Sequence, residues 1–572
     1  MIIRSPLPDL DIPKAWTKSV DILTYLFPDG QPVSDEPVWI DAAKPSNNLS
    51  PKELLLWVKR LALGLDRLGI KEGDIVMLYS PNNIFVPVAY LGIVGSCRAF
   101  SAANPIYTVA EVTHQLKNTG AVCILAHPSM VENAVAAAKA AGLPKNRIFQ
   151  FDDKPCQPFA GVKDWRQMMA SVQDAEGYQW KKLHGEESVR TVATINYSSG
   201  TTGLPKGVCV SHHNLIANVA QTINIRWPKL DFQRGEKPQG ERWVGFLPLY
   251  HAYGQLYVNL MATKCDIPVY VMQQFVYSDF LQHIQDYKIT HLQVAPPIMV
   301  MLTKRPETKN YDLSSLKGML CGAAPLSKEL QNHVQRDFNV EVKQGWGMTE
   351  VTCGSLLQRE ASDSGTVGEL IANTECKLLD DDGNEVGYDT PGEMYIRAPN
   401  VCLGYFKNDA ATKDSISPDG WLKTGDVAIV NKQGLFWIVD RKKEASLTRT
   451  TMSDLIKVNA LQVAPAELEA VLLEHDDIAD AAVVGITLHD EEWPRAYVAL
   501  KDHAKGKLTA KDIQQWMKPK VAKHKQLVGG IAFVDEVPKL ASGKIQRKVM
   551  REWAKRDAPG IEREFNNLRA RL

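Results

Sequence analysis

Short apolar runs alternate with helix-length segments through much of the first 350 residues, and this alternation restricts the possible folds most. Residues 52 to 68 place apolar side chains at helical spacing, and Ile75 to Tyr79 then reads as a strand. A helix near residues 85 to 94, a strand at 122 to 126 and a helix at 131 to 141 continue the pattern. Strands that alternate with helices indicate parallel α/β packing.

The same pattern continues further along the chain. We expect a strand that ends in Phe246 to His251, and further strands at Pro268 to Met272, His291 to Val294 and Leu316 to Leu320. Gly-rich turns follow some of these strands. Turns at the carboxyl ends of parallel strands are where ligands bind in this architecture.

The pattern of predicted secondary structure changes twice after these strands. From about residue 366 short strands and turns predict a β-rich subdomain, and beyond the charged run at 440 to 444 a compact α+β tail follows. We therefore predict a large N-terminal domain over 1–440, a hinge with an inserted loop over 441–454 and a small mobile C-terminal domain over 455–572. Residues 153 to 190 are polar without a clear period, and we interpret them as a surface excursion.

The run from Tyr197 to Gly207 has the composition of a phosphate-holding loop. Glycines let backbone N–H groups face an anion, hydroxyls add donors and Lys206 adds positive charge. Pro205 stands where a Walker A loop has glycine, so this is a different kind of loop. A flexible linker is the alternative, but it leaves the preceding strand and the embedded Pro-Lys-Gly unexplained. The predicted phosphate-side residues are Ser198, Ser199, Gly200, Thr201, Thr202, Gly203 and Lys206.

Composition excludes several classes of protein. Among 572 residues, 45% are apolar and 23% are charged, which is typical of a soluble globular enzyme. Lysine plus arginine equals aspartate plus glutamate at 66 each, so no overall charge favours nucleic acid or an acidic membrane. The nine cysteines show no zinc spacing and read as reduced thiols of an intracellular protein.

Targeting signals are confined to the end of the sequence. The start lacks the apolar core of a signal peptide, and the longest apolar stretch, around 85 to 97, is too short for an integral membrane segment. The ending Ala570-Arg571-Leu572 is a variant of the peroxisomal Ser-Lys-Leu address. We therefore expect the peroxisomal matrix, through an import receptor, with the cytoplasm as the alternative.

Eight stretches in this order resemble the adenylate-forming acyl-CoA synthetases, and most closely the 4-coumarate:CoA ligase and aryl-alkanoate:CoA ligase group. They are YSSGTTGLPKGV, LPLYHAYG, GAAPL, QGWGMTE, GWLKTGDVA, DRKKE, QVAPAELE and SGKIQRK. The resemblance covers nearly the whole chain. It implies that a carboxylate attacks the α-phosphate of MgATP to give an acyl-AMP, and that the thiol of coenzyme A then displaces AMP.

The resemblance also implies roles for residues that contact the nucleotide. Thr349 is similar to the α-phosphate contact, and Glu350 to the Mg²⁺ ligand, with Thr202 beside it, because a hard cation prefers oxygen. Asp426 resembles the ribose-binding aspartate, and Arg441 its partner. The remaining nucleotide-side positions are Gly322, Ala323, Ala324, Pro325, Gln344, Gly345, Trp346, Gly347 and Met348.

Other positions resemble the catalytic tail, the hinge and the acyl pocket. Lys544 resembles the lysine that reaches the α-phosphate and carboxylate, and a flexible cation on a mobile tail suits transient charge. Lys457 and Gln462 match tail positions, and Lys443 matches the hinge. His251 and Tyr253 resemble the gate and wall of the acyl pocket, to which Gly322 and Gly347 also belong.

Each of these residues also has a purely structural interpretation. Asp426 fits a turn, Glu350 a helix cap, Lys544 a solvated surface charge and His251 a core histidine. Their joint occurrence favours the functional interpretation for the ATP-side residues, whereas His251 and Tyr253 are nearer to even.

Four departures from the family pattern fall on the hinge or the coenzyme A side. Ala445 to Asp454 is inserted, Asn459 and Ala460 replace the usual Lys-Gly, and Gln274 replaces a lysine associated with coenzyme A. A methyl group at Ala460 would crowd a close backbone approach.

The leading prediction is an ATP-dependent carboxylic acid:CoA ligase that acts on an aryl, aryl-alkanoic or medium-chain acid. One alternative is an adenylation enzyme with a weak or absent coenzyme A step, which loads a carrier protein or an amine or resembles luciferase. The other is a catalytically silent nucleotide-binding protein.

Overall fold

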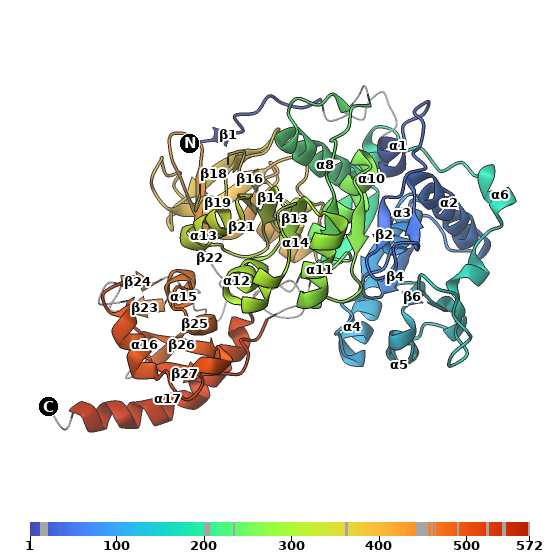
Figure 1. The fold of residues 1–572 in the computed structure, drawn as a ribbon. Helices are drawn as coiled ribbons and strands as arrows, with labels where there is room; N and C mark the ends of the chain where they lie inside the picture. The colour runs from blue at the N-terminus through green and yellow to red at the C-terminus, as the bar shows by residue number, and fades with distance from the viewer. Residues whose placement is uncertain are drawn as a thin grey trace.

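A computed structural model of the chain shows a large body with a small C-terminal unit at one side (Figure 1). The structure describes residues 1–11, 21–198, 206–232, 235–360, 364–441, 456–458, 461–463, 465–488, 491–521, 525–539 and 545–569. The predicted fold class is confirmed, because parallel α/β layers, a β-rich subdomain and a small α+β unit are all present.

The first sheet of the body has eight strands in the order β20-β10-β9-β5-β4-β6-β7-β8. Its strands are β4 (Ile75–Tyr79), β5 (Ala99–Ala102), β6 (Cys123–Ala126), β7 (Ile148–Gln150), β8 (Lys163–Asp164), β9 (Val192–Ser198), β10 (Lys206–Ser211) and β20 (Gly404–Tyr405). The strands from β4 to β8 run parallel, whereas β9 and β10 form an antiparallel pair in which Lys206 lies opposite Ser198. The phosphate-loop segment thus connects two paired strands.

Helices cover both faces of this sheet. They are α2 (Pro51–Arg67), α3 (Val86–Val94), α4 (Val109–Thr119) and α5 (Val131–Ala141). Val76 and Leu78 pack on the side of α2 and α3, while Ile75 and Met77 pack on the side of α4 and α5. Every residue of α3 is buried, because this apolar helix lies inside the body.

The second sheet has nine strands in the order β17-β16-β15-β14-β13-β11-β12-β2-β3. They are β2 (Trp39–Asp41), β3 (Asn48–Leu49), β11 (Trp243–Gly245), β12 (Val269–Val271), β13 (His291–Val294), β14 (Gly318–Cys321), β15 (Glu341–Trp346), β16 (Leu356–Leu357) and β17 (Glu369–Leu370). Helices α11 (Tyr277–Tyr287), α12 (Pro296–Lys304) and α13 (Lys328–Phe338) pack on one face. Helix α8 (His212–Arg226) and the π-helical segment η5 (Gln255–Met261) lie on the other.

One strand boundary differs from the prediction. The strand expected to end in Phe246 to His251 ends at Gly245, and the following residues lead into the short helix α9 (Ala252–Gly254). Pro248 lacks an N–H for strand pairing, and its carbonyl accepts a hydrogen bond from the His251 N–H in a turn. His251 in turn caps α9, so the end of the apolar run belongs to a turn and a cap.

The β-rich subdomain is an antiparallel five-stranded sheet in the order β1-β18-β19-β21-β22. Its strands are β1 (Ile3–Arg4), β18 (Glu375–Leu379), β19 (Gly392–Arg397), β21 (Leu422–Val430) and β22 (Phe436–Arg441). Residues of β21 alternate between buried and half-buried, as expected for a sheet with one covered face.

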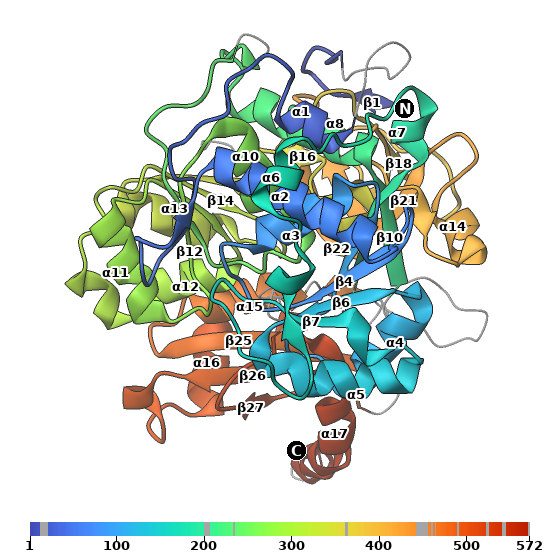
Figure 2. The same cartoon turned by 90° about the vertical axis from the view of Figure 1, so that its right-hand side faces the viewer.

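The C-terminal unit has its own sheets and apolar clusters, and Figures 1 and 2 show it below the body. It contains β23 (Ile456–Val458), β24 (Leu461–Val463), α15 (Pro465–Leu473), β25 (Ile478–Leu488), β26 (Glu491–Leu500), α16 (Ala510–Met517), β27 (Ile531–Phe533) and α17 (Arg547–Arg569). Lys304 Nζ of α12 donates to the His475 carbonyl at 3.1 Å, so the two parts touch. Lys443 and the insertion at 445–454 lie outside the described residues.

The segment 153–190 is more than the predicted surface excursion. It contributes Trp165 to the core, where the indole is fully buried and stacks on Trp57 at 5.8 Å. Two short helices, α6 (Val172–Glu176) and α7 (Glu186–Arg190), also lie in it. Val162, Met168 and Leu183 of this segment are buried as well, and periodicity does not detect such isolated anchors.

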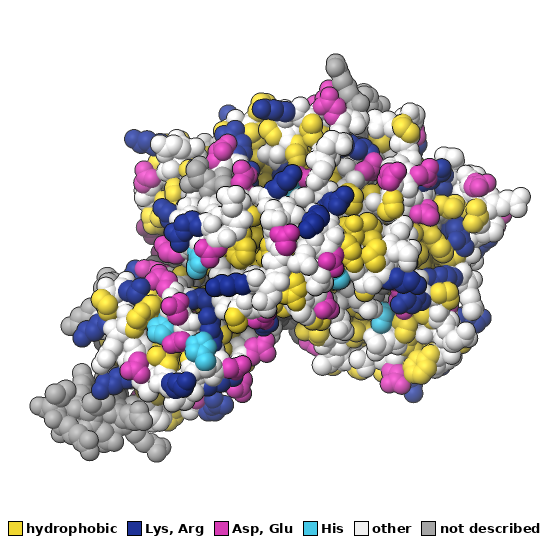
Figure 3. All heavy atoms as spheres, in the orientation of Figure 1, with side chains coloured by type: hydrophobic (Ala, Val, Ile, Leu, Met, Phe, Trp, Pro, Cys, Tyr) yellow, Lys and Arg dark blue, Asp and Glu magenta, His cyan; other side chains and the backbone are white. Residues whose placement is uncertain are grey.

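The surface agrees with the balanced charge of the sequence. Basic and acidic side chains are interspersed over the face drawn in Figure 3. All nine cysteines are unpaired thiols. Within the described ranges, no helix has the length and apolar character needed to cross a membrane.

Candidate active site

Glu350, Tyr405 and Lys206 form a polar cluster where three parts of the chain meet. The Tyr405 hydroxyl donates to Glu350 Oε1 at 3.0 Å, and Lys206 Nζ lies 5.1 Å from the centre of the Tyr405 ring. Pairing of β10 with β20 brings Tyr405 beside the strand that starts at Lys206. Two residues predicted from separate motifs, Lys206 and Glu350, therefore meet through a third.

The environment keeps Tyr405 in its protonated form. Burial, and then the neighbouring Glu350 carboxylate, raise the pKa of Tyr405. The Glu350 side chain is itself only 6% exposed, and its backbone carbonyl accepts from the Cys402 N–H at 2.8 Å. The carboxylate is thus held in position by both its side chain and its backbone.

Sequence reasoning missed Tyr405. Its segment, Val401 to Phe406, carries only the residues Gly404-Tyr405 as a local signal, and these suit any turn or short strand. Its role depends on pairing between β10 and β20, which are far apart in sequence.

Asp426 and Trp346 form the second polar contact of the site. Trp346 Nε1 donates to Asp426 Oδ2 at 2.8 Å, and Asp426 is 7% exposed. In the pairing of β21 with β22, Asp426 lies directly opposite Arg441. The two predicted ribose-side residues are therefore cross-strand neighbours at the level of the backbone.

The predicted adenine-side loop follows β14 directly. Ala323 in this loop has φ of 67°, the left-handed region that non-glycine residues seldom occupy. Such a conformation costs on the order of 1 kcal/mol or more and is frequent at ligand sites. Gly322, Ala324 and Pro325 flank it at the carboxyl end of the strand, where ligands bind in open α/β sheets.

Gln344 has a structural side chain. Its Nε2 donates to Gln331 Oε1 at 2.7 Å, and its N–H donates to Gln358 Oε1 at 2.6 Å. Its carbonyl accepts from the Gln358 N–H at 2.9 Å, so both the side chain and the backbone of Gln344 serve the sheet. Gly345, Gly347, Met348 and Thr349 follow it at the end of β15 and in the turn after it.

The predicted acyl side of the site includes Tyr253. Its hydroxyl donates to the Leu320 carbonyl at 2.8 Å, and burial raises the pKa of Tyr253. A Cβ added at Gly322 would lie 3.6 Å from the Tyr253 ring. His251 precedes it, with Nδ1 accepting from the Tyr253 N–H at 3.5 Å.

Gly347 makes a closer approach than Gly322. A Cβ at Gly347 would lie 1.7 Å from the Cys353 carbonyl oxygen, so only glycine fits there. We call Lys206, Glu350, Tyr405, Trp346 and Asp426 the nucleotide side, and Tyr253, Leu320 and Gly322 the acyl side.

Some predicted residues lie outside the part of the chain that the structure describes. They are Ser199, Gly200, Thr201, Thr202, Gly203, Asn459, Ala460, Lys544, Ala570, Arg571 and Leu572. Ser198, Arg441, Lys457 and Gln462 are described by their backbone, and Lys457 lies opposite Gln462 in the β23–β24 pair. Gln274 is exposed after β12.

No group of three histidine, cysteine or acidic side chains suited to a metal ion occurs in the part of the chain that the structure describes. Glu350 offers a single hard carboxylate. Mg²⁺ in nucleotide sites is commonly held by one or two carboxylates together with phosphates, so this donor set fits such an ion.

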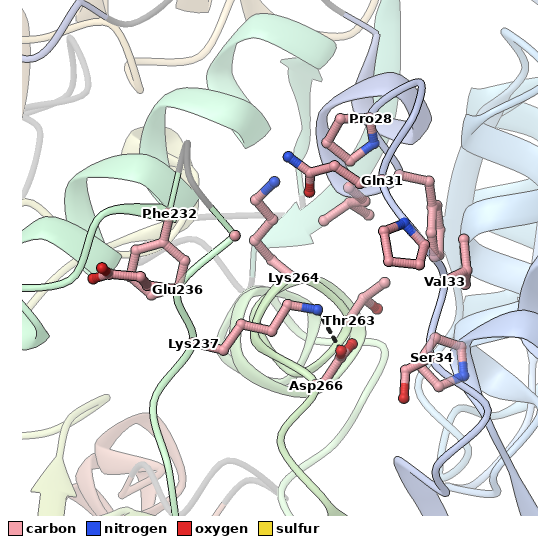
Figure 4. Close-up of a pocket in the computed structure, with 15 residues that line it drawn as sticks. Pro28, Gln31, Val33, Ser34, Phe232, Glu236, Lys237, Thr263, Lys264 and Asp266 are labelled. Carbon is pink, nitrogen blue, oxygen red and sulfur yellow. Dashed lines mark hydrogen bonds and ion pairs between the residues drawn. The ribbon is translucent and has the colours of Figure 1, made fainter.

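A separate pocket lies beside α1 (Ile22–Leu26), between it and α10 (Ala262–Cys265), and Figure 4 shows its lining. Lys237 and Asp266 form an ion pair there. Lys264 Nζ donates to the Tyr25 carbonyl at 2.8 Å. None of the predicted site residues lines this pocket.

Two family descriptions match the chain. Residues 29–406 match the AMP-binding enzyme family, and residues 467–544 match the AMP-binding enzyme C-terminal domain.

Curated relatives align over most of the chain. A phenylacetyl-CoA ligase, epaB of Aspergillus niger, is 33% identical over 94% of this chain and 97% of its own length. The 4-coumarate-CoA ligase 1 of Narcissus pseudonarcissus is 34% identical over 96% of each chain.

Solved structures share the fold. The anthranilate CoA ligase AuaEII in complex with anthranoyl-AMP superposes with a TM-score of 0.81 at 22% identity, over 95% of this chain and 98% of that one. At this identity the likeness shows the fold alone.

Proposed function

This chain belongs to the adenylate-forming acyl-CoA synthetase superfamily, and we propose that it is an ATP-dependent carboxylic acid:CoA ligase. One observation carries the proposal beyond family membership. The buried Glu350 carboxylate is held by Tyr405 beside Lys206, with Asp426 held by Trp346 on the same side of the site. This arrangement suits a nucleoside triphosphate.

The first step joins the acid to the nucleotide. A carboxylate oxygen attacks the α-phosphorus of ATP, the bond to the β-phosphate oxygen breaks, and pyrophosphate leaves with that electron pair. Lys206 supplies positive charge for the phosphates, which must be in place before two anions approach each other. Glu350 would hold Mg²⁺, which neutralises phosphate charge when bound.

The second step transfers the acyl group. The thiol sulfur of coenzyme A attacks the acyl carbonyl, the thiol proton is lost, and AMP leaves as the carbon–oxygen bond breaks. Asp426 would accept hydrogen bonds from the ribose hydroxyls and so retain AMP between the steps. Lys544 would reach the α-phosphate in the first step from the C-terminal unit.

We propose an aryl, aryl-alkanoic or medium-chain acid as substrate. Relatives named phenylacetyl-CoA ligase and 4-coumarate-CoA ligase support an aryl group. The Tyr253 ring beside Gly322 supports it further, because an aromatic wall next to a glycine leaves a flat slot.

A second candidate is favoured by the departures on the coenzyme A side. Asn459 and Ala460 replace the usual Lys-Gly, and Gln274 replaces a lysine. These changes favour an enzyme that makes the acyl-AMP but passes it poorly to coenzyme A, and uses an amine or a carrier protein instead.

One experiment separates these functions. Purified protein is incubated with MgATP, coenzyme A and a panel of acids, and pyrophosphate and acyl-CoA are measured in the same reaction. Equal acid-dependent rates support the ligase. A rate of pyrophosphate release several-fold above the rate of acyl-CoA formation supports another acceptor. If no acid gives acid-dependent pyrophosphate release, the chain is a nucleotide-binding protein without ligase activity.

We further propose the peroxisomal matrix as its location, on the strength of Ala570-Arg571-Leu572 alone. A fluorescent fusion that keeps this C-terminus is expected to enter peroxisomes. Deletion of the three residues is expected to leave the fusion in the cytoplasm.

A further inference from the structure

The pocket of Figure 4 holds a lysine amine that is not paired with a carboxylate. Lys264 Nζ donates to the Tyr25 carbonyl at 2.8 Å and lies 4.7 Å from the centre of the Tyr25 ring. Among the residues that the structure describes, no carboxylate pairs with Lys264, and the carboxylate of Asp266 is paired with Lys237. Figure 4 shows the Lys264 amine pointing away from that ion pair, toward Gln31. The amine therefore has one hydrogen bond and faces the pocket.

The surroundings of Lys264 favour its neutral form. Burial lowers the pKa of Lys264 to about 8, and the positive charge of Lys237 acts in the same direction. The acidic groups of the pocket have other partners, because Asp266 pairs with Lys237 and Glu236 accepts from the Asp231 N–H. At pH 7 about a tenth of such an amine is neutral, compared with less than about a thousandth of an ordinary lysine. A desolvated lysine beside a second cation is a typical activated nucleophile.

The pocket has room for a short acyl group. Its volume is about 30 Å³, which holds about two water-sized groups, such as the oxygen and the methyl group of an acetyl group. Pro28, Val33 and Phe232 give an apolar lining for the methyl group. The lining residues Gln31 and Glu236 are exposed, so the pocket opens to solvent.

We propose that Lys264 is a modification site, which is acylated by short acyl thioesters such as acetyl-CoA. The lone pair of the neutral amine attacks the thioester carbonyl carbon, the carbon–sulfur bond breaks, and sulfur leaves with the electron pair. The nitrogen loses one proton, which the thiolate takes up, so the products are an amide and a free thiol. This inference goes beyond the proposed ligase function and does not depend on it.

The amide product suits the pocket better than the charged amine does. The amide nitrogen keeps one N–H, which can still donate to the Tyr25 carbonyl. The amide is neutral, so the penalty for removing an ammonium group from water disappears. Acylation of Lys264 is therefore expected to raise Tm.

The first test uses the wild-type protein. Purified protein is incubated with acetyl-CoA at pH 7 without ATP, and acetylation of each lysine is followed over time by mass spectrometry. Lys229, which is exposed and outside the pocket, and the ion-paired Lys237 are the two references. Lys264 is expected to react about 10-fold or more faster than either, because its larger neutral fraction outweighs the lower nucleophilicity of a weaker base. In urea, where the pocket is lost, the three lysines are expected to react at similar rates.

Two further comparisons test whether the pocket causes the difference. Octanoyl-CoA is expected to reduce the advantage of Lys264 over Lys229 several-fold, because its chain is longer than the pocket can hold. Val33→Phe places a larger side chain in the lining and is expected to slow acetylation of Lys264 several-fold. The rate at Lys229 is expected to be unchanged in this variant.

Lys264→Gln, an uncharged mimic of the amide, separates this site from the ligase reaction. It is expected to match or exceed the wild-type Tm and to keep the wild-type rate of acid-dependent pyrophosphate release. Acetylation of Lys264 no faster than that of Lys229, or a rate that Val33→Phe leaves unchanged, would overturn the inference and leave the ligase function intact. Absence of acid-dependent pyrophosphate release in the wild-type protein would overturn the proposed function alone.

Discussion

The nucleotide side and the acyl side differ in how their polar groups are held. On the nucleotide side Glu350 accepts from Tyr405 and Asp426 accepts from Trp346, so both carboxylates have protein partners. On the acyl side the Tyr253 hydroxyl donates to a backbone carbonyl, and the set contains no charged side chain. The proposed roles agree with this difference, because the charged nucleotide is common to every reaction whereas the acid varies.

This difference has a physical reason. Charge develops at the phosphates in every reaction cycle, and preorganised groups stabilise it without reorganising at the moment of reaction. Selection between two acids depends on the difference in the free energies of their transition states. This difference is largest where a buried polar group loses its hydrogen-bond partner when the wrong acid binds. The two regions can therefore be separated by substitution.

The largest effect is expected from Glu350→Gln on the nucleotide side. The amide oxygen can still accept from Tyr405, so the fold is retained, but the negative charge for the metal ion is lost. Acid-dependent pyrophosphate release is expected to fall about 100- to 1000-fold. The order of preference among the acids of the panel is expected to stay unchanged.

Glu341→Gln is the control for this variant. Glu341 is exposed at the start of β15, away from the loops at the carboxyl end of the sheet. It is expected to behave like wild type. A Glu350→Gln enzyme with normal rates at limiting Mg²⁺ would disprove the role given to this carboxylate.

Asp426→Asn is expected to have the next largest effect. Trp346 can still donate to the amide oxygen, whereas one acceptor for the ribose hydroxyls becomes a donor. Loss of hydrogen bonds to a charged group costs about 1.5–3 kcal/mol, so KM for ATP is expected to rise about 10- to 100-fold. Steady-state kinetics with ATP and acid varied separately provide the measurement.

The acid KM is expected to stay within a factor of about two in this variant. Asp419→Asn, in an exposed turn of the same subdomain, serves as the matched control. A rise in the acid KM equal to that for ATP would mean that the two sides are not separate.

The nucleotide side could largely be predicted from the sequence, because its residues lie in contiguous motifs. Local patterns also predicted the strands: β4 and β13 appear as continuous apolar or alternating runs. Local periodicity cannot reveal contacts between distant segments. Tyr405 reaches Glu350 from 55 positions away, through the pairing of β10 with β20.

The segments that were predicted wrongly have the same explanation. The apolar run from Phe246 to Tyr250 resembles a strand, but the Pro248 turn and the His251 cap end it early. The polar stretch 153–190 hides Trp165, whose burial depends on Trp57, Phe85 and Phe151 from other elements. Tertiary packing overrode the local pattern in both cases.

Gly322→Ala tests the acyl side directly, with a smaller expected effect. Its new Cβ would lie 3.6 Å from the Tyr253 ring, an ordinary contact that the fold accommodates. The slot beside Tyr253 becomes narrower, so kcat/KM for aryl acids is expected to fall about 10-fold, in line with one methyl group in a pocket. KM for ATP and Tm are expected to be unchanged.

Gly347→Ala is the informative contrast, because the same added carbon would lie 1.7 Å from a backbone carbonyl. That variant is expected to lower Tm and to lose activity with all acids together. Equal behaviour of the two variants would show that glycine at 322 serves the backbone and not the slot.

The smallest effect is expected at Lys264. This amine carries a desolvation penalty, and it lies outside the predicted site. Burial lowers the pKa of Lys264 from 10.5 to about 8, and its neighbours are the Tyr25 carbonyl and ring. The folded state thus disfavours the charged amine. This penalty is complete below pH 8, where both states are charged, and disappears as pH rises toward 10.5, where the unfolded state also loses its proton.

Lys264→Met is therefore expected to stabilise the protein by about 1 kcal/mol at pH 7, with partial exposure reducing the full value. Thermal unfolding at pH 7 and at pH 9.5 should show the gain in Tm shrinking at the higher pH, while Lys264→Arg shows no gain. Acid preference should be unchanged in both variants, because the pocket of Figure 4 contains none of the site residues. A change in acid preference in Lys264→Met would mean that the pocket of Figure 4 is coupled to the acyl side.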